Sequence, residues 1–384
     1  MTKIRILHVA QAAGGVDRYL RSLLKYIDKD KFENILVCSQ DYKESDYAGI
    51  VDSFEQVKMG REISLKDDLS ATIEIRKMIK KYKPDIVYAH SSKAGVLGRF
   101  ANIGFKNKCI YNPHGWSFNM DCSEKKKNLY ITIERISSIF CDQIVCISNA
   151  EYHSALQHKI CKADKLKVIF NGIDIDQYRQ NRIRRLTKQD IGIPDDSFVI
   201  GMVGRVSEQK APDIFAKAAK LIKKVIPNSY FIIVGNGNLE DEIKKYVIEN
   251  GLNNSFKITG WVENPMDYIQ LFDEAMLLSR WEGFGLVLPE YMIARKPIIA
   301  TNIDAIPDLI NDGNNGLLVP VNDPEEVSKK ALSLYQDKSL YNKLANNGEE
   351  IVYKKFDAKR VANEHEILFE SLSGIGEYKE KSIL

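Results

Sequence analysis

Short apolar runs alternate with longer amphipathic stretches along nearly the whole chain. In the first half the apolar runs are rich in β-branched residues, which is typical of buried strands. Strands are expected there at 4–10, 34–39, 85–89, 108–112, 143–147 and 166–170. Helices are expected at 16–27, 67–82, 93–103, 125–140 and 149–157. Continuous apolar strands separated by helices predict a parallel sheet covered on both faces.

The alternation breaks in the polar, basic stretch from Asn171 to Ser197 and then restarts. Further strands are expected at 198–203, 230–234, 256–259, 275–279, 297–301 and 316–319. Helices are expected at 211–225, 239–249, 265–271 and 290–294, and the chain after 323 is helical in pattern, with its last ordered helix at 358–372. A chain of 384 residues is too long for one compact core. The pattern therefore predicts an α/β protein with two doubly wound, Rossmann-like domains.

The expected first domain comprises residues 1–175 and the expected second domain residues 198–357, joined by a linker at 176–197. Residues 358–384 follow the second domain. Doubly wound sheets bind ligands outside the carboxyl ends of their strands, so the loops at those ends are the places to look for chemistry.

The segment 282–290, Glu-Gly-Phe-Gly-Leu-Val-Leu-Pro-Glu, follows one expected strand and opens a helix. Gly283 and Gly285 allow the backbone to approach a ligand closely, and Pro289 suits the first turn of a helix. Free N–H groups at that helix start suit a phosphate, while Glu282 and Glu290 can accept hydrogen bonds from sugar hydroxyls. The segment favours a sugar-diphosphate site. The alternative is a tight turn flanked by solvated carboxylates.

Three more loops carry candidate chemistry. Arg205 and Lys210 follow the first strand of the second domain. The planar guanidinium of the arginine and the ammonium group of the lysine could bind two phosphates there. His114 follows a first-domain strand in a glycine-bearing loop, which is where α/β active sites form, although a lone histidine is more often structural. Gly14 and Gly15 follow the first strand, but the pair lacks the third glycine of a dinucleotide fingerprint.

Composition narrows the function classes. No apolar run approaches the roughly 20 residues of a membrane helix. The six cysteines show no close pairing typical of a metal or redox site, so reduced thiols in a cytosolic protein are expected. Residues 1–190 hold 33 basic and 23 acidic side chains, against 22 and 29 in the remainder. A basic first half favours an anionic partner, or is simply a charged, solvated surface, and no nucleic-acid motif accompanies it.

Glu282-x-Phe284-Gly285, with a second glutamate eight residues after the first, resembles the signature of the retaining glycosyltransferases of family 4, which have the GT-B fold. The stretches 296–301, 306–308 and 312–319 also resemble that family. The resemblance covers nearly all of the chain. It implies two Rossmann-like domains facing across a cleft, with the last helix returning to the first domain.

The resemblance also implies roles for individual residues. Arg205 and Lys210 would neutralise the departing diphosphate, which removes the need for a metal, and no Asp-x-Asp motif lies on a suitable loop. His114 would contact the transferred sugar, Glu282 its hydroxyls, and Glu290 the ribose. The remaining implied substrate contacts are Gly15, Asn171, Gly235, Trp261, Val262, Phe284, Gly285 and Leu286. No cofactor is expected beyond a nucleotide-sugar substrate, with UDP as the nucleotide.

The implied reaction moves a hexose or N-acetylhexosamine from a UDP-sugar to a polyprenyl-diphosphate-linked glycan. Residues 89–95 resemble the acceptor-side segment of enzymes that build lipid-linked surface polysaccharides. The family's glycine pair before its Pro-Glu is replaced here by 304–308, a change that bears on donor identity. The basic and aromatic stretch 116–135 suggests peripheral contact with the inner membrane face, or an ordinary amphipathic helix.

Two rival functions remain. A UDP-N-acetylglucosamine 2-epimerase has similar architecture, but it needs acid–base carboxylates in the first domain, and the sequence singles none out. A non-catalytic sugar-nucleotide binder would not need the two clamp cations that this chain carries.

Overall fold

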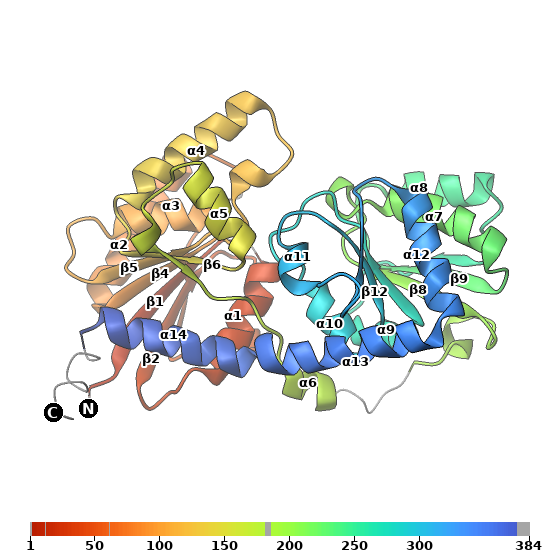
Figure 1. The fold of residues 1–384 in the computed structure, drawn as a ribbon. Helices are drawn as coiled ribbons and strands as arrows, with labels where there is room; N and C mark the ends of the chain where they lie inside the picture. The colour runs from red at the N-terminus through yellow and green to blue at the C-terminus, as the bar shows by residue number, and fades with distance from the viewer. Residues whose placement is uncertain (1, 12, 61, 181–185, 375–384) are drawn as a thin grey trace. The chain divides into compact units, whose positions relative to one another are not determined.

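The computed structural model describes residues 2–374 apart from 12, 61 and 181–185. The chain forms two compact units (Figure 1). The first comprises residues 1–172 and 358–384, and the second comprises 173–357. Each unit is an α/β structure with its own parallel sheet.

Among its described residues, the first unit contains a seven-stranded sheet in the order β3-β2-β1-β4-β5-β6-β7. Every neighbouring pair is parallel. The strands are β1 Ile4–Ala10, β2 Phe32–Cys38, β3 Ser53–Gln56, β4 Ile86–His90, β5 Lys108–Asn112, β6 Gln143–Cys146 and β7 Leu166–Val168. Most of these side chains are buried because helices cover both faces.

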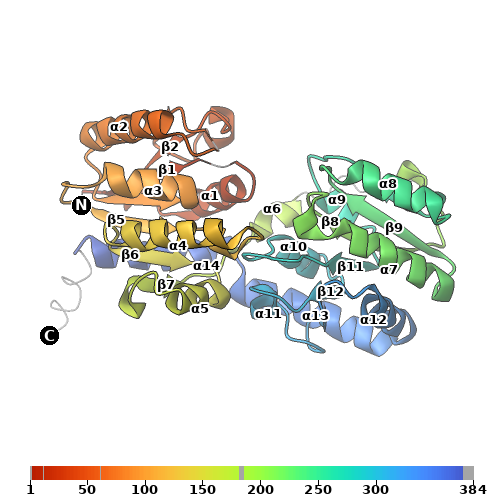
Figure 2. The same ribbon diagram turned by 90° about the horizontal axis from the view of Figure 1, so that it is seen from above.

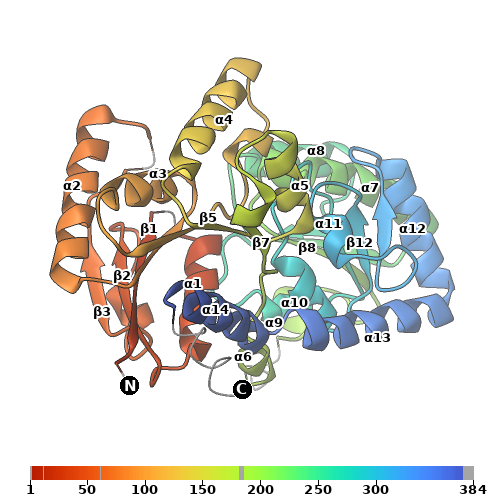
Figure 3. The same ribbon diagram turned by 60° about the vertical axis from the view of Figure 1, so that its left-hand side comes forward.

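One face of this sheet packs against α1 (Gly15–Tyr26) and α14 (Ala358–Leu372), which contact each other. The opposite face packs against α2 (Leu65–Tyr82), α3 (Ser92–Ala101), α4 (Glu124–Ser138) and α5 (Asn149–Gln157). Figure 3 shows the sheet of this unit separating α2 and α3 from α1 and α14. The last helix thus belongs to the core of the first unit, where Phe369 meets the ring of Phe32.

The described residues of the second unit contain a six-stranded parallel sheet in the order β10-β9-β8-β11-β12-β13. Its strands are β8 Phe198–Val203, β9 Ser229–Val234, β10 Phe256–Ile258, β11 Glu274–Leu277, β12 Ile298–Thr301 and β13 Leu317–Val319. Its helices are α6 Ile175–Gln180, α7 Pro212–Val225, α8 Glu240–Glu249, α9 Met266–Ile269, α10 Val287–Ile293, α11 Ile306–Leu309, α12 Pro324–Gln336 and α13 Lys338–Lys355. Helix α7 packs against both α8 and α12 over one face of the sheet (Figure 2).

Three elements, namely β3, α6 and α11, and one boundary differ from the sequence expectations. Strand β3 was not expected, because Ser53–Gln56 is a short, half-exposed edge strand without an apolar run. Helix α11 is a single turn that begins at Ile306. The division between units falls after Gly172, so α6, which begins inside the expected first domain and runs into the linker 176–197, groups with the second unit. Residues 181–185 of that linker lie outside the described residues.

Candidate active site

The loop after β8 in the second unit carries both candidate cations. Its backbone is held against β9, with Gly204 N–H donating to Val234 O at 3.0 Å. A Cβ on Gly235 would lie 2.1 Å from the Gly204 oxygen, so only glycine permits this approach. Arg205 is exposed, and its guanidinium has no hydrogen bond or ion pair with any described residue. It is therefore available to an anion.

Lys210 ends the short 3₁₀ turn that precedes α7 and forms an ion pair with Glu282. A Cβ on Gly204 would lie 3.4 Å from Lys210 Cγ, so the lysine stem passes directly over this glycine. The two charged side chains are only 17% and 10% exposed. The loops that follow β8 and β11 are thereby joined at the carboxyl end of the sheet, as expected for a doubly wound unit.

Glu282 is held from several directions. Ser279 Oγ lies 3.2 Å from Glu282 Oε2, and the Glu282 backbone N–H donates to Asp304 Oδ2 at 2.9 Å. Burial raises the pKa of the Asp304 carboxyl, the hydrogen bond from the Glu282 amide opposes this rise, and the nearby Glu282 charge adds to it. Asp304, which lies in the segment where this chain departs from the family pattern, thus positions the Glu282 loop.

Arg280 braces the same two loops from the side. Its guanidinium donates two hydrogen bonds to Asp213, both at 2.9 Å, and also bonds to Glu208 and Asn322. Burial opposes ionisation of the Asp213 carboxyl, but the Arg280 hydrogen bonds and charge lower its pKa overall. Both bonds to Asp213 come from Nη2, while Nε bonds to Asn322 and Nη1 to Glu208, so the guanidinium is fixed through all three of its nitrogens. Neither Arg280 nor Asp304 was singled out from the sequence, because neither stands in a recognisable motif.

The segment that begins at Gly283 turns into α10. Gly285 has φ +80°, and a Cβ there would lie 3.1 Å from Leu277 Cδ2. Helix α10 is wholly buried, and Tyr291 Oη accepts a hydrogen bond from Val203 N–H at 2.7 Å. This bond ties the helix to the strand that carries the Arg205 loop.

Other predicted contacts of the second unit occupy different surroundings. Glu290 is 2% exposed and accepts a hydrogen bond from Tyr178 Oη at 2.7 Å. Phe284 is buried against Phe356, while Leu286 is half-buried.

Trp261 is 74% exposed, and Val262 is half-buried beside it. Asp174, part of the nearest match to a metal-binding Asp-x-Asp, instead caps α6, accepting from Gln177 N–H at 3.0 Å.

Three predicted residues belong to the first unit. Gly15 is the first residue of α1, and a Cβ there would meet no atom within 4 Å. Asn171 is 3% exposed, and its Oδ1 has no hydrogen-bond partner among the described residues. His114 follows β5 with φ +51°, a strained conformation for a residue with a side chain. Asn112 Oδ1 accepts its backbone N–H at 2.9 Å.

His114 does not stand alone. Its Nε2 lies 3.1 Å from His90 Nδ1, and its ring meets that of Tyr19 edge-on. Desolvation lowers the pKa of the His114 imidazole to about 3, with the charge of His365 adding to the effect. His114 is therefore neutral at physiological pH. His90 lies in the segment expected to contact the acceptor, whereas nothing in the sequence indicated Tyr19 or His365.

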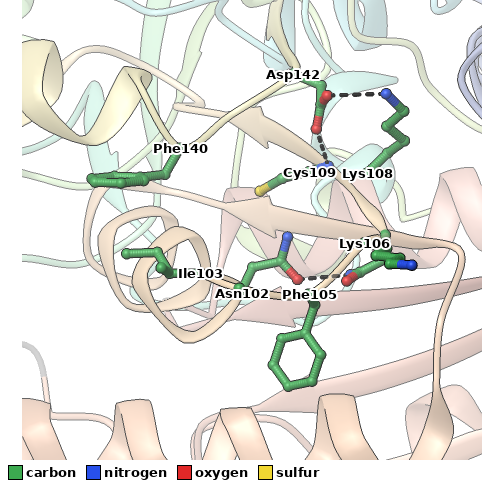
Figure 4. A pocket seen from close by; sticks show the side chains of 10 residues that line it. Asn102, Ile103, Phe105, Lys106, Lys108, Cys109, Phe140 and Asp142 are labelled. Atoms are coloured by element: carbon green, nitrogen blue, oxygen red, sulfur yellow. Dashed lines mark hydrogen bonds and ion pairs between the residues drawn. The ribbon is translucent and has the colours of Figure 1, made fainter.

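A pocket of about 310 Å³ lies near the start of β5, at the amino end of the first unit's strands and away from the loop that carries His114. Figure 4 shows Asp142 bonded to Lys108 and to the backbone of Cys109 in its wall. None of the predicted site residues lines this pocket.

The described residues contain no group of three or more His, Cys, Asp or Glu side chains arranged to hold a metal. No helix within them is both long and apolar enough to cross a membrane.

Two family models match this chain: "Glycosyl transferases group 1" over residues 183–351 and "Glycosyltransferase Family 4" over residues 13–177. The chain is 30% identical over 369 residues to the Escherichia coli UDP-Gal:alpha-D-GlcNAc-diphosphoundecaprenol alpha-1,3-galactosyltransferase, covering 94% of this chain and 95% of that protein. This chain belongs to glycosyltransferase family 4.

Two further likenesses extend over almost the whole glycosyltransferase. The capsular polysaccharide biosynthesis glycosyltransferase CapM of Staphylococcus aureus is 24% identical, with 96% of this chain and 97% of that protein covered. The crystal structure of Anabaena Alr3699/HepE in complex with UDP is similar at a TM-score of 0.80 and 22% identity, covering 96% and 100% of the two chains. The two Rossmann-like units are those of the GT-B fold, which confirms the fold that the sequence predicted.

Proposed function

We propose that this glycosyltransferase moves a hexose or N-acetylhexosamine from a UDP-sugar to a polyprenyl-diphosphate-linked glycan, with retention of the anomeric configuration. The observation that carries the proposal is the Lys210–Glu282 pair at the carboxyl end of the second sheet. Lys210 shares its loop with Arg205, which has no ion-pair partner in the described part of the chain. A sugar diphosphate presents hydroxyl donors next to phosphate oxygens. This group of residues offers a carboxylate for the hydroxyls and two cations for the phosphates.

The cations act on the leaving group. As the bond between the anomeric carbon and the β-phosphate oxygen breaks, negative charge grows on the diphosphate. Arg205 and Lys210 stabilise that charge most where it is largest, in the transition state. Lys210 exchanges its contact with Glu282 for a contact with phosphate, and Glu282 then accepts from sugar hydroxyls. The positive charge that a divalent metal would supply comes from these side chains, so transfer is metal-independent.

The acceptor hydroxyl attacks on the face from which the diphosphate departs. Its oxygen bonds to the anomeric carbon, its proton passes to the departing phosphate oxygen, and UDP leaves. No enzymic nucleophile is needed, and Glu282 serves as a binding group. His114 contacts the transferred sugar, while the buried carboxylate of Glu290 binds the ribose hydroxyls.

The relatives support the choice of substrates. The name of the Escherichia coli relative specifies a UDP-galactose donor, a diphosphoundecaprenol-linked acceptor and an α-1,3 linkage. An α-linked donor that gives an α-linked product has kept its configuration. The Anabaena neighbour has been crystallised with UDP. The chain would then work at the cytoplasmic membrane face, where its basic first half meets a lipid-linked acceptor.

A donor screen tests the proposal. The purified protein is incubated with UDP- and GDP-sugars, with and without lipid extract and with EDTA, and nucleotide release is followed. We expect one UDP-sugar to release UDP only with extract and undiminished by EDTA, and NMR of the product to show the donor's anomeric configuration. Inversion would refute the retaining step, and loss of activity with EDTA would refute metal independence. Donor interconversion without UDP release would indicate an epimerase instead.

A further inference from the structure

A line of hydrogen bonds connects His114 to the interior of the first unit. His114 Nε2 lies 3.1 Å from His90 Nδ1, and His90 Nε2 lies 3.2 Å from His8 Nδ1. His8 Nε2 lies 3.1 Å from Asn34 Oδ1. His8, His90 and Asn34 are all completely buried, whereas His114 is partly exposed. Three buried side chains thus lead outward to one candidate site residue.

The register of the sheet explains this alignment. His8 pairs with Tyr88, two residues before His90, and Asn34 pairs with Ile6, two residues before His8. Side chains two residues apart in a strand point to the same face. The line therefore runs diagonally across β2, β1 and β4, on the face covered by α1 and α14, to the carboxyl edge where His114 follows β5.

All three imidazoles are neutral. Burial lowers the pKa of His8 to about 4. Burial also lowers the pKa of His90 well below the usual value, and the mutual repulsion that protonated neighbouring histidines would cause adds to this shift. His114 has a pKa of about 3 for the same reason. A neutral imidazole carries one donor nitrogen and one acceptor nitrogen. Within a line of such rings, the direction of one hydrogen bond therefore fixes the direction of all.

Asn34 sets that direction. Its Oδ1 can only accept, so His8 donates from Nε2 and must accept at Nδ1. His90 then donates from Nε2 and accepts at Nδ1, and His114 donates from Nε2. The remaining nitrogen of His114, Nδ1, is left as an acceptor. No described residue hydrogen-bonds to it.

We propose that Asn34, His8 and His90 are positioning residues that hold His114 in the tautomer with a bare Nδ1, so that His114 accepts a hydrogen bond from a substrate hydroxyl. The inference rests on the proposed function for the identity of that substrate. It assigns His114 to hydroxyl recognition and excludes it as a proton donor to phosphate. The ligand group at this position must itself be a donor, as a sugar hydroxyl is.

The tautomer can be read directly by ¹⁵N NMR of the full chain labelled at histidine, because the protonated and bare ring nitrogens resonate far apart. The sequence has six histidines, so single substitutions assign every signal. In the wild type we expect a bare Nδ1 and a protonated Nε2 on His114. A protonated Nδ1 there would overturn the proposal.

Asn34→Leu is the decisive variant. It removes the acceptor while keeping a side chain of similar size, and an unpaired buried N–H on His8 costs more than an unpaired lone pair. We expect the line to reverse, so that His114, three hydrogen bonds away, carries its proton on Nδ1. The kcat for transfer should fall about tenfold, the equivalent of one hydrogen bond. An unchanged His114 tautomer in this variant would overturn the proposal.

A second test variant and a matched control complete the experiment. His90→Leu breaks the line next to His114 and should leave that ring as a mixture of tautomers, so a single unchanged tautomer would count against the proposal. His365→Leu is the matched control: it removes another fully buried imidazole from the same core, one bonded to Tyr19 and Tyr88 and not to the line. It should lower stability without changing the His114 tautomer. Absence of transfer by the wild type would refute the proposed function, while the NMR result would still decide this inference.

Discussion

In the proposed reaction, single residues bind the donor and stabilise its leaving group. Lys210 has a carboxylate partner in the free protein and a phosphate partner in the proposed reaction, and one flexible lysine can serve both. Arg205 lies on the same loop and has no ion-pair partner among the described residues. Glu290 is buried and accepts a hydrogen bond from Tyr178. These differences give the charged residues different expected phenotypes.

Lys210→Ala should lower kcat for transfer about 10²- to 10³-fold, the usual loss when one group that stabilises developing charge is removed. Glu282→Ala should abolish transfer, because the sugar hydroxyls lose their acceptor. UDP release measures both, and circular dichroism checks that both variants remain folded. Lys217→Ala is the control, because its exposed pair with Asp213 contributes little. Near-normal turnover in both site variants would refute the assignment.

Glu290→Gln should weaken binding of UDP about tenfold or more, because hydrogen bonds from the ribose to a charged acceptor are replaced by bonds to a neutral one. Isothermal titration with UDP measures this change without any acceptor. Tyr178→Phe should have a smaller effect, because it removes a donor to Glu290 and leaves the carboxylate in place. If UDP affinity were unchanged in Glu290→Gln, the ribose contact would be wrong.

At the scale of elements, the loops at the carboxyl ends of β8, β9 and β11 are held together by direct contacts. Gly235 allows the β9 loop to touch the backbone of the β8 loop, and Arg280 ties the β8 loop to the β11 loop. Helix α4 of the first unit presents a different surface. Leu129 and Ile136 on it are each 51% exposed, and Lys125 and Lys126 are exposed near its start.

Gly235→Ala should displace the loop that carries Arg205, because its Cβ would lie 2.1 Å from a backbone oxygen and φ is +143°. We expect a clear fall in melting temperature and a large loss of transfer. Gly251→Ala is the matched control: φ is +69°, but a Cβ would meet no atom, so only the conformational cost of about 1 kcal/mol remains. Equal melting temperatures for the two variants would show that the close contact is unimportant.

If α4 rests on an anionic membrane, substituting Lys125, Lys126 and Lys127 with Ala should reduce vesicle binding by more than tenfold, since each lysine near such a surface contributes about 1 kcal/mol. Co-sedimentation with phosphatidylglycerol-containing vesicles measures binding, and added salt should weaken it. Substituting Lys244 and Lys245 on α8 with Ala is the control, since both are exposed on the second unit. Equal binding by wild type and the α4 variant would leave α4 an ordinary amphipathic helix.

For the whole molecule, buried titratable groups predict how stability depends on pH. In the first unit, burial lowers the pKa of His8 and His365 to about 4, that of His114 to about 3 and that of His90 well below 6.5. These histidines take up protons below about pH 6.5 only when unfolded, so the free energy of unfolding falls as pH is lowered from there towards about 4.

Glu151 works in the opposite sense. Burial raises the pKa of its carboxyl from 4.5 to about 8, so its effect lowers stability as pH rises through that window. Burial also raises the pKa of Glu274 in the second unit to about 8, but four histidines outweigh these two carboxyls, and the melting temperature should fall between about pH 6.5 and 4.5. Glu151→Gln should make that fall steeper. A melting temperature that rises on acidification would contradict the burial of neutral histidines.

Most of the elements and their order follow from the pattern of apolar and polar residues alone. Strands β1 and β5 and helices α5 and α14 have the predicted limits, because continuous apolar runs and helical periodicity depend only on neighbours in the chain. The nine residues from Glu282 to Glu290 predict a sugar-nucleotide loop, because close approach to a ligand demands glycine at specific positions. Edge strand β3 escaped prediction, since pairing on one side requires no apolar run.

Which distant side chains meet depends on the folded structure as a whole. Lys210 and Glu282 are 72 residues apart, and Tyr88 and His365 are 277 apart, yet each pair is in contact. His114 is predicted as a site residue from its loop, but its link to Asn34 depends on the register of three parallel strands. Register and burial are collective properties of the folded sheet, and no local pattern encodes which distant partner a buried polar group will find.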